Sequence, residues 1–327
     1  MPGPGGGAHR ARTAPDRQAG GRPHRLAGPA DGVRFDRNPV RGCAGARPDH
    51  RSGAPGRHRP GHRLRGSGGR RPEGSLLGYH RHRGSRGKAG GPVSRTILIF
   101  GASSGIGLAT ASLAAAESWR VVAASRRGVT PGLESPLVRA ERCDVRDYEA
   151  VCDLVGAHAD ADAVVNCAGV GAYAPLGRDM APYWRDIVDT TLLGCIHVLS
   201  ATLRLARACP IVAIVGSLAG QRPSPTEGND VYAAAKAGMA RAVADFRLRL
   251  RQQGNAMKVA LVVPGFVEGT DFGRTYFRSA EGEGRDLYAG FPSLTPADVA
   301  RTLWWCLNQP DTVDIGTVVV RPLMQPD

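Results

Sequence analysis

The segment from Thr96 to Glu117 limits the possible folds of this chain more than any other part of the sequence. A short apolar run, 96–100, is followed by the turn Gly101-Ala-Ser-Ser-Gly-Ile-Gly107 and then by an alanine-rich stretch. An apolar run without alternation is typical of a strand buried on both faces, and the alanines that follow favour a helix. The glycines let the backbone turn tightly between the two. The segment therefore predicts a strand–turn–helix unit with an anion site at the helix N-terminus.

The same alternation continues to the end of the chain. Short Val- and Ile-rich runs predict further strands, and longer stretches between them predict helices. We expect strands at 120–124, 138–143, 163–166, 211–215, 259–263 and 317–321, and helices near 148–155, 183–206, 231–252 and 296–307. Strands that alternate with helices form a parallel sheet covered on both sides. The predicted fold is α/β: a Rossmann-like, doubly wound parallel sheet in three layers (α/β/α), one domain over 95–327.

The first 94 residues differ from the rest in composition. They hold 20 Lys and Arg against 5 Asp and Glu, whereas the remainder holds 23 against 24. They are rich in Gly and Pro and poor in apolar residues, so we expect a disordered tail at 1–94. A basic arm for nucleic acid or anionic membrane is one reading, but Phe35 and Tyr79 are its only aromatics for stacking bases. A targeting peptide would need an apolar region that is absent. We favour a passive or mis-annotated, over-extended start, with Val93 as an alternative first residue.

The remaining composition indicates a protein of a reducing compartment. Seven scattered cysteines form no C-x-x-C pair, which argues against a disulfide framework or a metal site. No apolar run approaches the ~18 residues that a membrane span needs. We therefore expect a cytoplasmic protein without a bound metal and without a membrane segment.

Three residues suggest acid–base chemistry. Tyr232 and Lys236 are four positions apart in a predicted helix, so they share one face. A free tyrosine, with a pKa near ~10, is a poor base at neutral pH. A nearby ammonium favours the phenolate, which can then take a proton from an alcohol or return it to a carbonyl. Ser217 follows a predicted buried strand and can hold the substrate oxygen.

The glycine turn and the end of the second strand indicate the cofactor. The turn lies where a doubly wound sheet holds a dinucleotide pyrophosphate, and Ser103 and Ser104 can donate to phosphate. An NAD site would place a carboxylate after the second strand for the ribose hydroxyls. This chain has Arg126 and Arg127 there. Guanidinium groups pair with a phosphate, so NADP(H) is favoured over NAD.

Taken together, these motifs resemble the short-chain dehydrogenase/reductase family over about residues 95–325. The resemblance implies an oxidoreductase that acts on a CH–OH group, with Ser217, Tyr232 and Lys236 as catalytic residues and a homodimer or homotetramer as the assembly. Later stretches are similar to an NADP-dependent subgroup that oxidises 3-hydroxy acids such as serine and allo-threonine. The cofactor-binding residues it implies are Gly101, Ser103, Ser104, Gly105, Ile106, Gly107, Arg126, Arg127, Asp144, Val145, Asn166, Ala168, Gly169, Tyr232, Lys236, Pro264, Gly265 and Val267.

The chain departs from the family pattern at two places. Thr191 stands where the family usually has an asparagine that supports a proton relay to the lysine. A single hydroxyl is not expected to copy both hydrogen-bonding functions of a carboxamide, so the relay should be weaker. Ser217 also precedes Tyr232 by 15 positions, slightly more than is usual. The loop between them can absorb the excess.

The substrate stays open at this point. Arg274, Arg278 and Arg285 follow Pro264-Gly265 and are candidate partners for a substrate carboxylate. Tyr276, Phe277 and Tyr288 in the same stretch suit a neutral ketone instead. Our hypothesis is an NADP(H)-dependent oxidoreductase of a secondary alcohol or ketone, with a 3-hydroxy acid as candidate substrate. The alternatives are a general carbonyl reductase, a catalytically weak NADP(H)-binding sensor, and a nucleic-acid-associated protein acting through its basic tail.

Overall fold

The computed structural model describes residues 95–223, 227–276 and 290–326. Within them, parallel strands form one seven-stranded sheet in the order β3-β2-β1-β4-β5-β6-β7. This confirms the predicted doubly wound α/β fold. The strands are β1 Thr96–Phe100, β2 Arg120–Ser125, β3 Val138–Arg142, β4 Ala163–Asn166, β5 Ile211–Val215, β6 Lys258–Pro264 and β7 Thr317–Val320.

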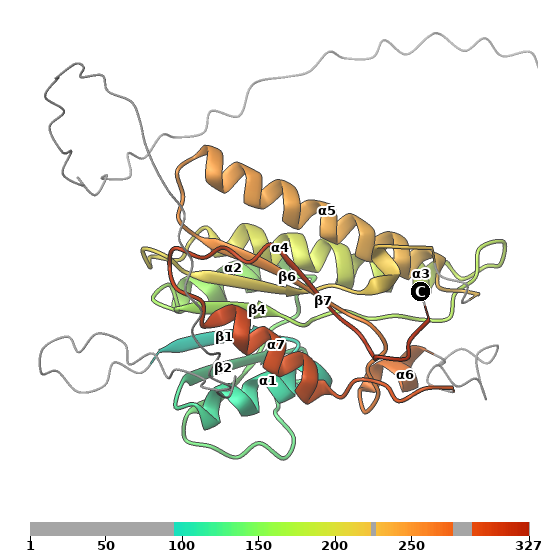
Figure 1. Ribbon diagram of the computed structural model, residues 1–327, viewed down its shortest axis with the longest axis horizontal. Helices are drawn as coiled ribbons and strands as arrows, with labels where there is room; N and C mark the ends of the chain where they lie inside the picture. The colour runs from blue at the N-terminus through green and yellow to red at the C-terminus, as the bar shows by residue number, and fades with distance from the viewer. Residues whose placement is uncertain (1–94, 224–226, 277–289, 327) are drawn as a thin grey trace, which may run out of the picture. The chain divides into compact units, whose positions relative to one another are not determined.

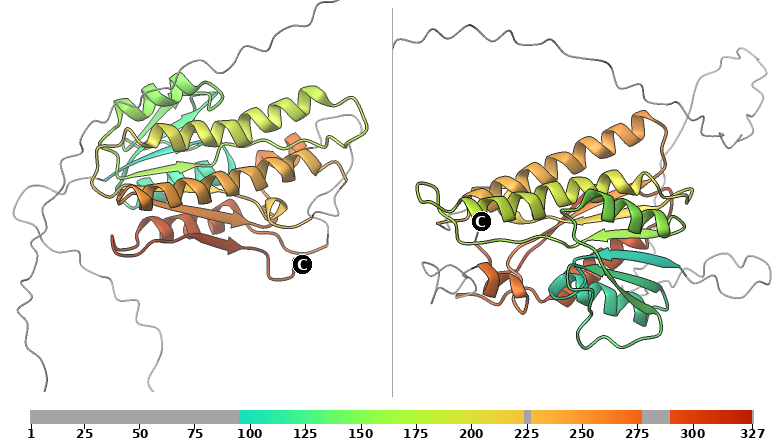
Figure 2. Two further views of the ribbon diagram at one scale, coloured as in Figure 1. Left: turned by 90° about the horizontal axis from the view of Figure 1, so that it is seen from above. Right: turned by 180° about the vertical axis from the view of Figure 1, so that it is seen from behind.

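Helices cover both faces of this sheet (Figures 1 and 2). One layer holds α2 (Tyr148–Ala157), α4 (Gly194–Thr202) and α5 (Asp230–Gln252), and the other holds α1 (Gly105–Ala116) and α7 (Pro296–Leu307). Alternate residues of β1 pack into two hydrophobic cores, one on each face of the sheet. Leu98 and Phe100 pack with α2, α4 and α5, whereas Ile97 and Ile99 pack with α1 and α7. All four side chains are fully buried, which explains why the sequence of this strand is continuously apolar.

The order of the strands determines where the functional site begins. The chain moves outward from β1 to β3 and then returns to the other side of β1 to form β4. At such a reversal the loops after the two central strands diverge and leave a crevice at their carboxyl ends. The Gly101–Gly107 turn follows β1, and Cys167 to Gly169 follow β4, so both segments border this crevice.

The prediction of one long α-helix over 183–206 is wrong in detail. The chain forms α3 (Ala181–Ile187), then a π-helical segment, η1 (Val188–Leu193), and then α4, which ends at Thr202. The apolar spacing was right for a helix, but periodicity alone does not reveal the wider π-turns. π-segments inside α-helices often occur at functional sites, and η1 contains Thr191.

Two other short elements lie near the crevice. The 3₁₀ turn η2 (Leu218–Gly220) follows β5, and helix α6 (Asp271–Tyr276) follows β6. By contrast, α7 begins with a full capping box, in which Thr295 and Asp298 bond reciprocally, and with Pro296 at its first turn. Across the described ranges, none of the helices is both long and apolar enough to cross a membrane.

Candidate active site

One cavity of about 650 Å³ extends from the glycine turn to the start of α5. Its walls include the loops at the carboxyl ends of β1, β2, β3, β4, β5 and β6. Most of the site residues named from the sequence line it. They are Gly101, Ser103, Ser104, Gly105, Ile106, Gly107, Arg126, Arg127, Val145, Ala168, Gly169, Ser217, Tyr232, Lys236, Pro264, Gly265 and Val267.

The glycine turn is shaped so that side chains would not fit. Gly101 has φ +79°, and a Cβ atom there would lie 2.6 Å from the backbone nitrogen of Ala168. A Cβ atom on Gly107 would collide with the carbonyl group of Gly101. These two positions bring the first turn of α1 close to β1 and β4 and leave its backbone N–H groups open to a ligand. This cradle fits the pyrophosphate of a dinucleotide.

Arg127 reaches from the end of β2 to the glycine turn. Its Nη2 donates to Ser103 Oγ at 2.8 Å, and its Nε donates to the same oxygen at 3.2 Å. Nη2 also lies 3.4 Å from Asp271 Oδ2, at the start of α6. Arg126, next to it, is exposed and lines the same cavity. Two guanidinium groups therefore flank the adenosine end of the predicted dinucleotide path.

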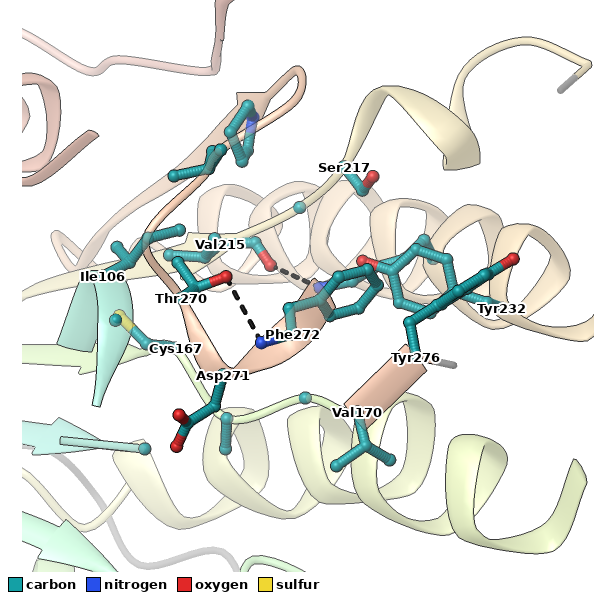
Figure 3. A pocket seen from close by; sticks show the side chains of 18 of the residues that line it. Ile106, Cys167, Val170, Val215, Ser217, Tyr232, Thr270, Asp271, Phe272 and Tyr276 are labelled. Carbon is teal, nitrogen blue, oxygen red and sulfur yellow. Dashed lines mark hydrogen bonds between the residues drawn. The ribbon is translucent and has the colours of Figure 1, made fainter. Parts of the chain in front are cut away.

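Tyr232 and Lys236 meet the cavity from α5, one turn apart, as expected from their spacing. Lys236 is 6% exposed, and its Nζ donates to the carbonyl oxygen of Val215 at 2.9 Å (Figure 3). The same Nζ lies 5.8 Å from the ring centroid of Tyr232. Burial lowers the pKa of Lys236 to about 8. The ammonium is therefore mostly charged at neutral pH, but at a cost in desolvation.

Ser217 stands just after β5, at the N-terminus of η2. Its Oγ accepts a hydrogen bond from the Ala219 backbone N–H at 3.2 Å, which fixes the side chain. Figure 3 shows Ser217 and Tyr232 in the wall of the same cavity. A hydroxyl that accepts this bond can still donate its own proton to a substrate oxygen.

Thr191 lies behind this site and is fully buried. Its Oγ1 accepts from the Val170 backbone N–H at 3.1 Å and donates to the Val170 carbonyl oxygen at 3.0 Å. Thr191 thus uses its one hydroxyl as both acceptor and donor towards the Val170 backbone, and the weaker proton relay expected at this position stays a prediction. The two bonds fix the loop after β4. A Cβ atom on Gly169, in that loop, would lie 3.5 Å from Thr191 Oγ1 and 3.6 Å from Lys236 Nζ.

Asp144 and Asn166 are not in the cavity wall, although both were expected to contact the cofactor. The Asp144 carboxylate bonds to Arg146, with Nη2 to Oδ2 at 2.6 Å. Burial alone would raise the pKa of Asp144, but the hydrogen bonds from Arg146 outweigh it and hold that pKa below its usual value. Asn166 is 1% exposed, and its Oδ1 accepts from the Ala168 N–H at 3.0 Å. It therefore shapes the loop that carries Ala168 and Gly169.

Aromatic side chains from α6 close the other end of the cavity. The ring centroids of Phe272 and Tyr232 are 5.2 Å apart, and those of Phe272 and Tyr276 are 5.6 Å apart (Figure 3). The Tyr276 hydroxyl donates to Asn229 Oδ1 at 3.3 Å, beside the start of α5. The aromatic character expected of this loop is thus present at Tyr276. Phe277, Arg278, Arg285 and Tyr288 lie outside the described residues, and the side chain of Arg274 is not described.

Sequence reasoning missed the contribution of the C-terminal segment and of the loop after η2. The Gln325 Oε1 accepts from the Phe266 N–H at 3.1 Å and supports the loop after β6. Arg222 Nη2 donates to the Pro326 carbonyl oxygen at 2.9 Å. Arg222, Gln325 and Pro326 all line the cavity. No motif marks these positions, because they join the site only through contacts across about 60 to 100 residues of sequence.

The fold and the cavity define a dinucleotide-binding oxidoreductase, and comparison with known proteins names its family. The sequence model described as short chain dehydrogenase matches residues 95–281. The chain belongs to this short-chain dehydrogenase family. It is accordingly an oxidoreductase that acts on a CH–OH group with a nicotinamide dinucleotide as the acceptor.

Three individual relatives have sequence identities of 27–30% to this chain. The chain is 30% identical over 242 residues to the NADP-dependent 3-hydroxy acid dehydrogenase YdfG of Salmonella typhi, a match that covers 70% of this chain and 95% of that protein. It is 30% identical over 245 residues to serine 3-dehydrogenase of Agrobacterium fabrum, covering 71% and 96%. Among solved structures, the closed form of serine dehydrogenase complexed with NADP+ superposes with a TM-score of 0.64 at 27% identity, covering 71% and 96%.

Proposed function

We propose that this protein is an NADP(H)-dependent oxidoreductase that interconverts a secondary alcohol and a ketone, with 3-hydroxy acids as the substrate class. The observation that carries the proposal is the Tyr232–Lys236 pair. A buried ammonium lies one helical turn below a tyrosine that opens into a cavity, and the same cavity begins at a phosphate cradle. The names of the relatives at 30% identity support the substrate class.

In the proposed mechanism, Ser217 donates a hydrogen bond to the substrate oxygen and holds it beside Tyr232. In the oxidation direction, Tyr232 takes the proton of the substrate hydroxyl, and in reduction it returns a proton to the forming alkoxide. Lys236 supplies the positive charge that favours the phenolate form of Tyr232. The nicotinamide, when bound, accepts or supplies the hydride. The Val215 carbonyl and the loop fixed by Thr191 keep Lys236 in place.

The choice of NADP(H) rests on Arg126 and Arg127. Both line the cavity at the end of β2, where an NAD site would have a carboxylate. Arg127 already bonds to Ser103 Oγ, a hydroxyl that can share a phosphate oxygen with it. The remaining cofactor contacts that we propose come from the glycine turn, Val145, the Ala168–Gly169 loop, and the Pro264–Val267 loop.

A general carbonyl reductase is the second candidate function. The observation in its favour is the aromatic wall formed by Phe272 and Tyr276, which suits an apolar ketone. The catalytically weak sensor has no such support, because the relatives at 30% identity are named as dehydrogenases. We further propose a cytoplasmic homodimer or homotetramer that acts on a small molecule. Residues 1–94 lie outside the described residues, and their passive role stays a prediction.

The test is Tyr232→Phe, assayed by NADPH binding and by NADP-linked turnover of 3-hydroxy acids, sugars and simple alcohols. The substitution removes only the hydroxyl that carries the proton. We expect NADPH affinity to change less than threefold and turnover to fall at least ~100-fold, since general acid–base catalysis contributes about 10²–10⁴. Full activity in this variant would refute the mechanism. Binding of NADPH by the wild-type protein without turnover of any substrate would revive the sensor.

A further inference from the structure

Phe272 is an aromatic neighbour of Tyr232, the residue proposed to move the proton. It is the second residue of α6, and its ring centroid lies 5.2 Å from that of Tyr232, with the two ring planes tilted by 53° (Figure 3). Aromatic rings attract one another at this separation and tilt. Phe272 also lines the cavity. The Tyr232 ring, on α5, is therefore packed against a side chain that a different element supplies.

The Phe272 ring fills the space that a side chain at Gly171 would need. A Cβ atom on Gly171 would lie 2.5 Å from Phe272 Cζ and 2.6 Å from its Cε2, whereas carbon atoms pack at about 3.5–4.0 Å. Gly171 does not have the positive φ that disfavours other residues. Space, and not backbone conformation, therefore excludes a side chain at this position.

The loop that carries Gly171 is held from behind by Thr191. Both backbone groups of Val170, the residue before Gly171, bond to Thr191 Oγ1, at 3.1 and 3.0 Å. Thr191 is fully buried and belongs to η1. The surface against which the Phe272 ring packs is therefore fixed by a buried side chain.

Hydrogen bonds hold the last residue of α6, Tyr276, on two sides. The Tyr173 N–H, in the loop after β4, donates to the Tyr276 carbonyl oxygen at 2.6 Å. The Tyr276 hydroxyl donates to Asn229 Oδ1 at 3.3 Å. Asn229 immediately precedes α5, the helix that carries Tyr232. These bonds connect α6 both to the loop of Gly171 and to the helix of Tyr232, and so they fix Phe272 between the two.

We propose that Phe272 is a positioning residue for proton transfer: packed against Gly171, its ring holds the Tyr232 side chain in the orientation from which the hydroxyl reaches the substrate oxygen. The inference rests on the proposed role of Tyr232. A general acid or base must lie within about 2.6–3.2 Å of the atom that it serves, and a misplacement of about 1 Å can lower the rate about 10²-fold. Without the Phe272 ring, space opens beside the Tyr232 ring, and the hydroxyl can leave this position.

The test combines Gly171→Ala, which pushes the ring away, with Phe272→Ala, which removes it. Turnover of the best wild-type substrate among 3-hydroxy acids, sugars and simple alcohols gives kcat and KM, and fluorescence titration gives the NADPH affinity. We expect each variant to lower kcat about 10- to 100-fold and to change KM and NADPH affinity less than threefold. Gly156→Ala is the matched control and should behave as wild type, because a Cβ atom on that glycine of α2 meets nothing within 4 Å.

Two further variants separate positioning from a general loss of structure. In the protein that carries both Gly171→Ala and Phe272→Ala, the added methyl group no longer meets the ring. Its kcat should therefore stay within threefold of that of Phe272→Ala alone. Phe272→Leu keeps a branched apolar side chain beside Tyr232 and should recover part of the lost kcat.

Each other result decides against the inference. An unchanged kcat in Phe272→Ala, in a protein whose Tyr232→Phe variant is inactive, would overturn the inference and leave the proposed function standing. Losses that multiply in the double variant would show that the methyl group does not act through the ring. A loss confined to KM or to NADPH affinity would make Phe272 part of a binding surface and not a positioning residue for Tyr232. Full activity of Tyr232→Phe, or a wild type without turnover, would remove the proposed function, and the inference with it.

Discussion

Replacing Lys236 by methionine should stabilise the folded protein at neutral pH while it abolishes turnover. The residue is 6% exposed, and burial lowers the pKa of its ammonium from 10.5 to about 8. A lowered pKa in a lysine means that the folded state holds the charged form at a cost. The full cost in folding free energy applies below pH 8, where Lys236 is protonated in both the folded and the unfolded chain. It declines as the pH rises from 8 towards 10.5, because the folded chain has then lost the proton that the unfolded chain still binds.

The size of the destabilisation by the charged Lys236 follows from its pKa shift. Each pKa unit corresponds to 1.36 kcal/mol, so the charged form costs about 3 kcal/mol at pH 7, falling to about 1 kcal/mol at pH 10. Methionine has a similar length and no charge, but it leaves the Val215 carbonyl without its donor, which costs about 1 kcal/mol. The variant should therefore exceed the wild type in free energy of unfolding by about 2 kcal/mol at pH 7. At pH 10 the two proteins should be nearly equal.

Urea unfolding of the cofactor-free proteins between pH 7 and 10 measures this difference. Lys258→Met is the matched control, because Lys258 is also buried, at 5% exposure. Its Nζ bonds to the carbonyl oxygens of Gln309 and Pro310 at 3.0 and 3.3 Å and lies 3.6 Å from Asp311 Oδ1. Removing that ammonium leaves several acceptors unpaired. Lys258→Met should therefore lower the free energy of unfolding by about 1–3 kcal/mol.

At pH 7 the two variants should thus change the free energy of unfolding in opposite directions. A Lys236→Met protein less stable than the wild type at pH 7, by an amount that does not change up to pH 10, would refute the reasoning. It would mean that the ammonium is well solvated or well paired in the folded protein. A gain in stability accompanied by full catalytic activity would instead leave the burial argument intact and remove Lys236 from the mechanism.

Two further predictions concern other parts of the site. Arg127→Ala should weaken NADPH binding about 10- to 100-fold and leave NADH binding within threefold, because its guanidinium is proposed to pair with the 2′-phosphate; equal losses for both cofactors in fluorescence titrations would contradict this role. Thr191→Val should lower the free energy of unfolding by about 1–3 kcal/mol, since it leaves the Val170 N–H and carbonyl without their partner in a buried site. Thr191→Ser, which keeps the hydroxyl, is the control, and equal stability of the valine and serine variants in urea unfolding would show that the two bonds contribute nothing.

Much of the fold was predictable because it depends on local patterns. Continuous apolar runs such as 96–100 and 211–215 identified buried parallel strands, and the structure confirms both within a residue. The prediction of a single α-helix over 183–206 failed because α-helical and π-helical turns bury nearly the same apolar positions. The apolar spacing therefore does not distinguish the two kinds of turn. The structure shows Asp144 bonded to Arg146, and the cofactor contact expected of Asp144 stays a prediction.

Local sequence patterns were sufficient to predict the order of strands and helices, the glycine turn, and the placement of Tyr232 and Lys236 on one helical face. Each of these depends on residues a few positions apart, whose geometry the backbone fixes. Three properties became visible only in the folded chain: the depth at which Lys236 is buried, the use of the Thr191 hydroxyl, and the contact of Arg222 with the C-terminal segment. These properties arise from contacts between distant segments, and such contacts depend on how the whole sheet and its helices pack, which no local pattern records.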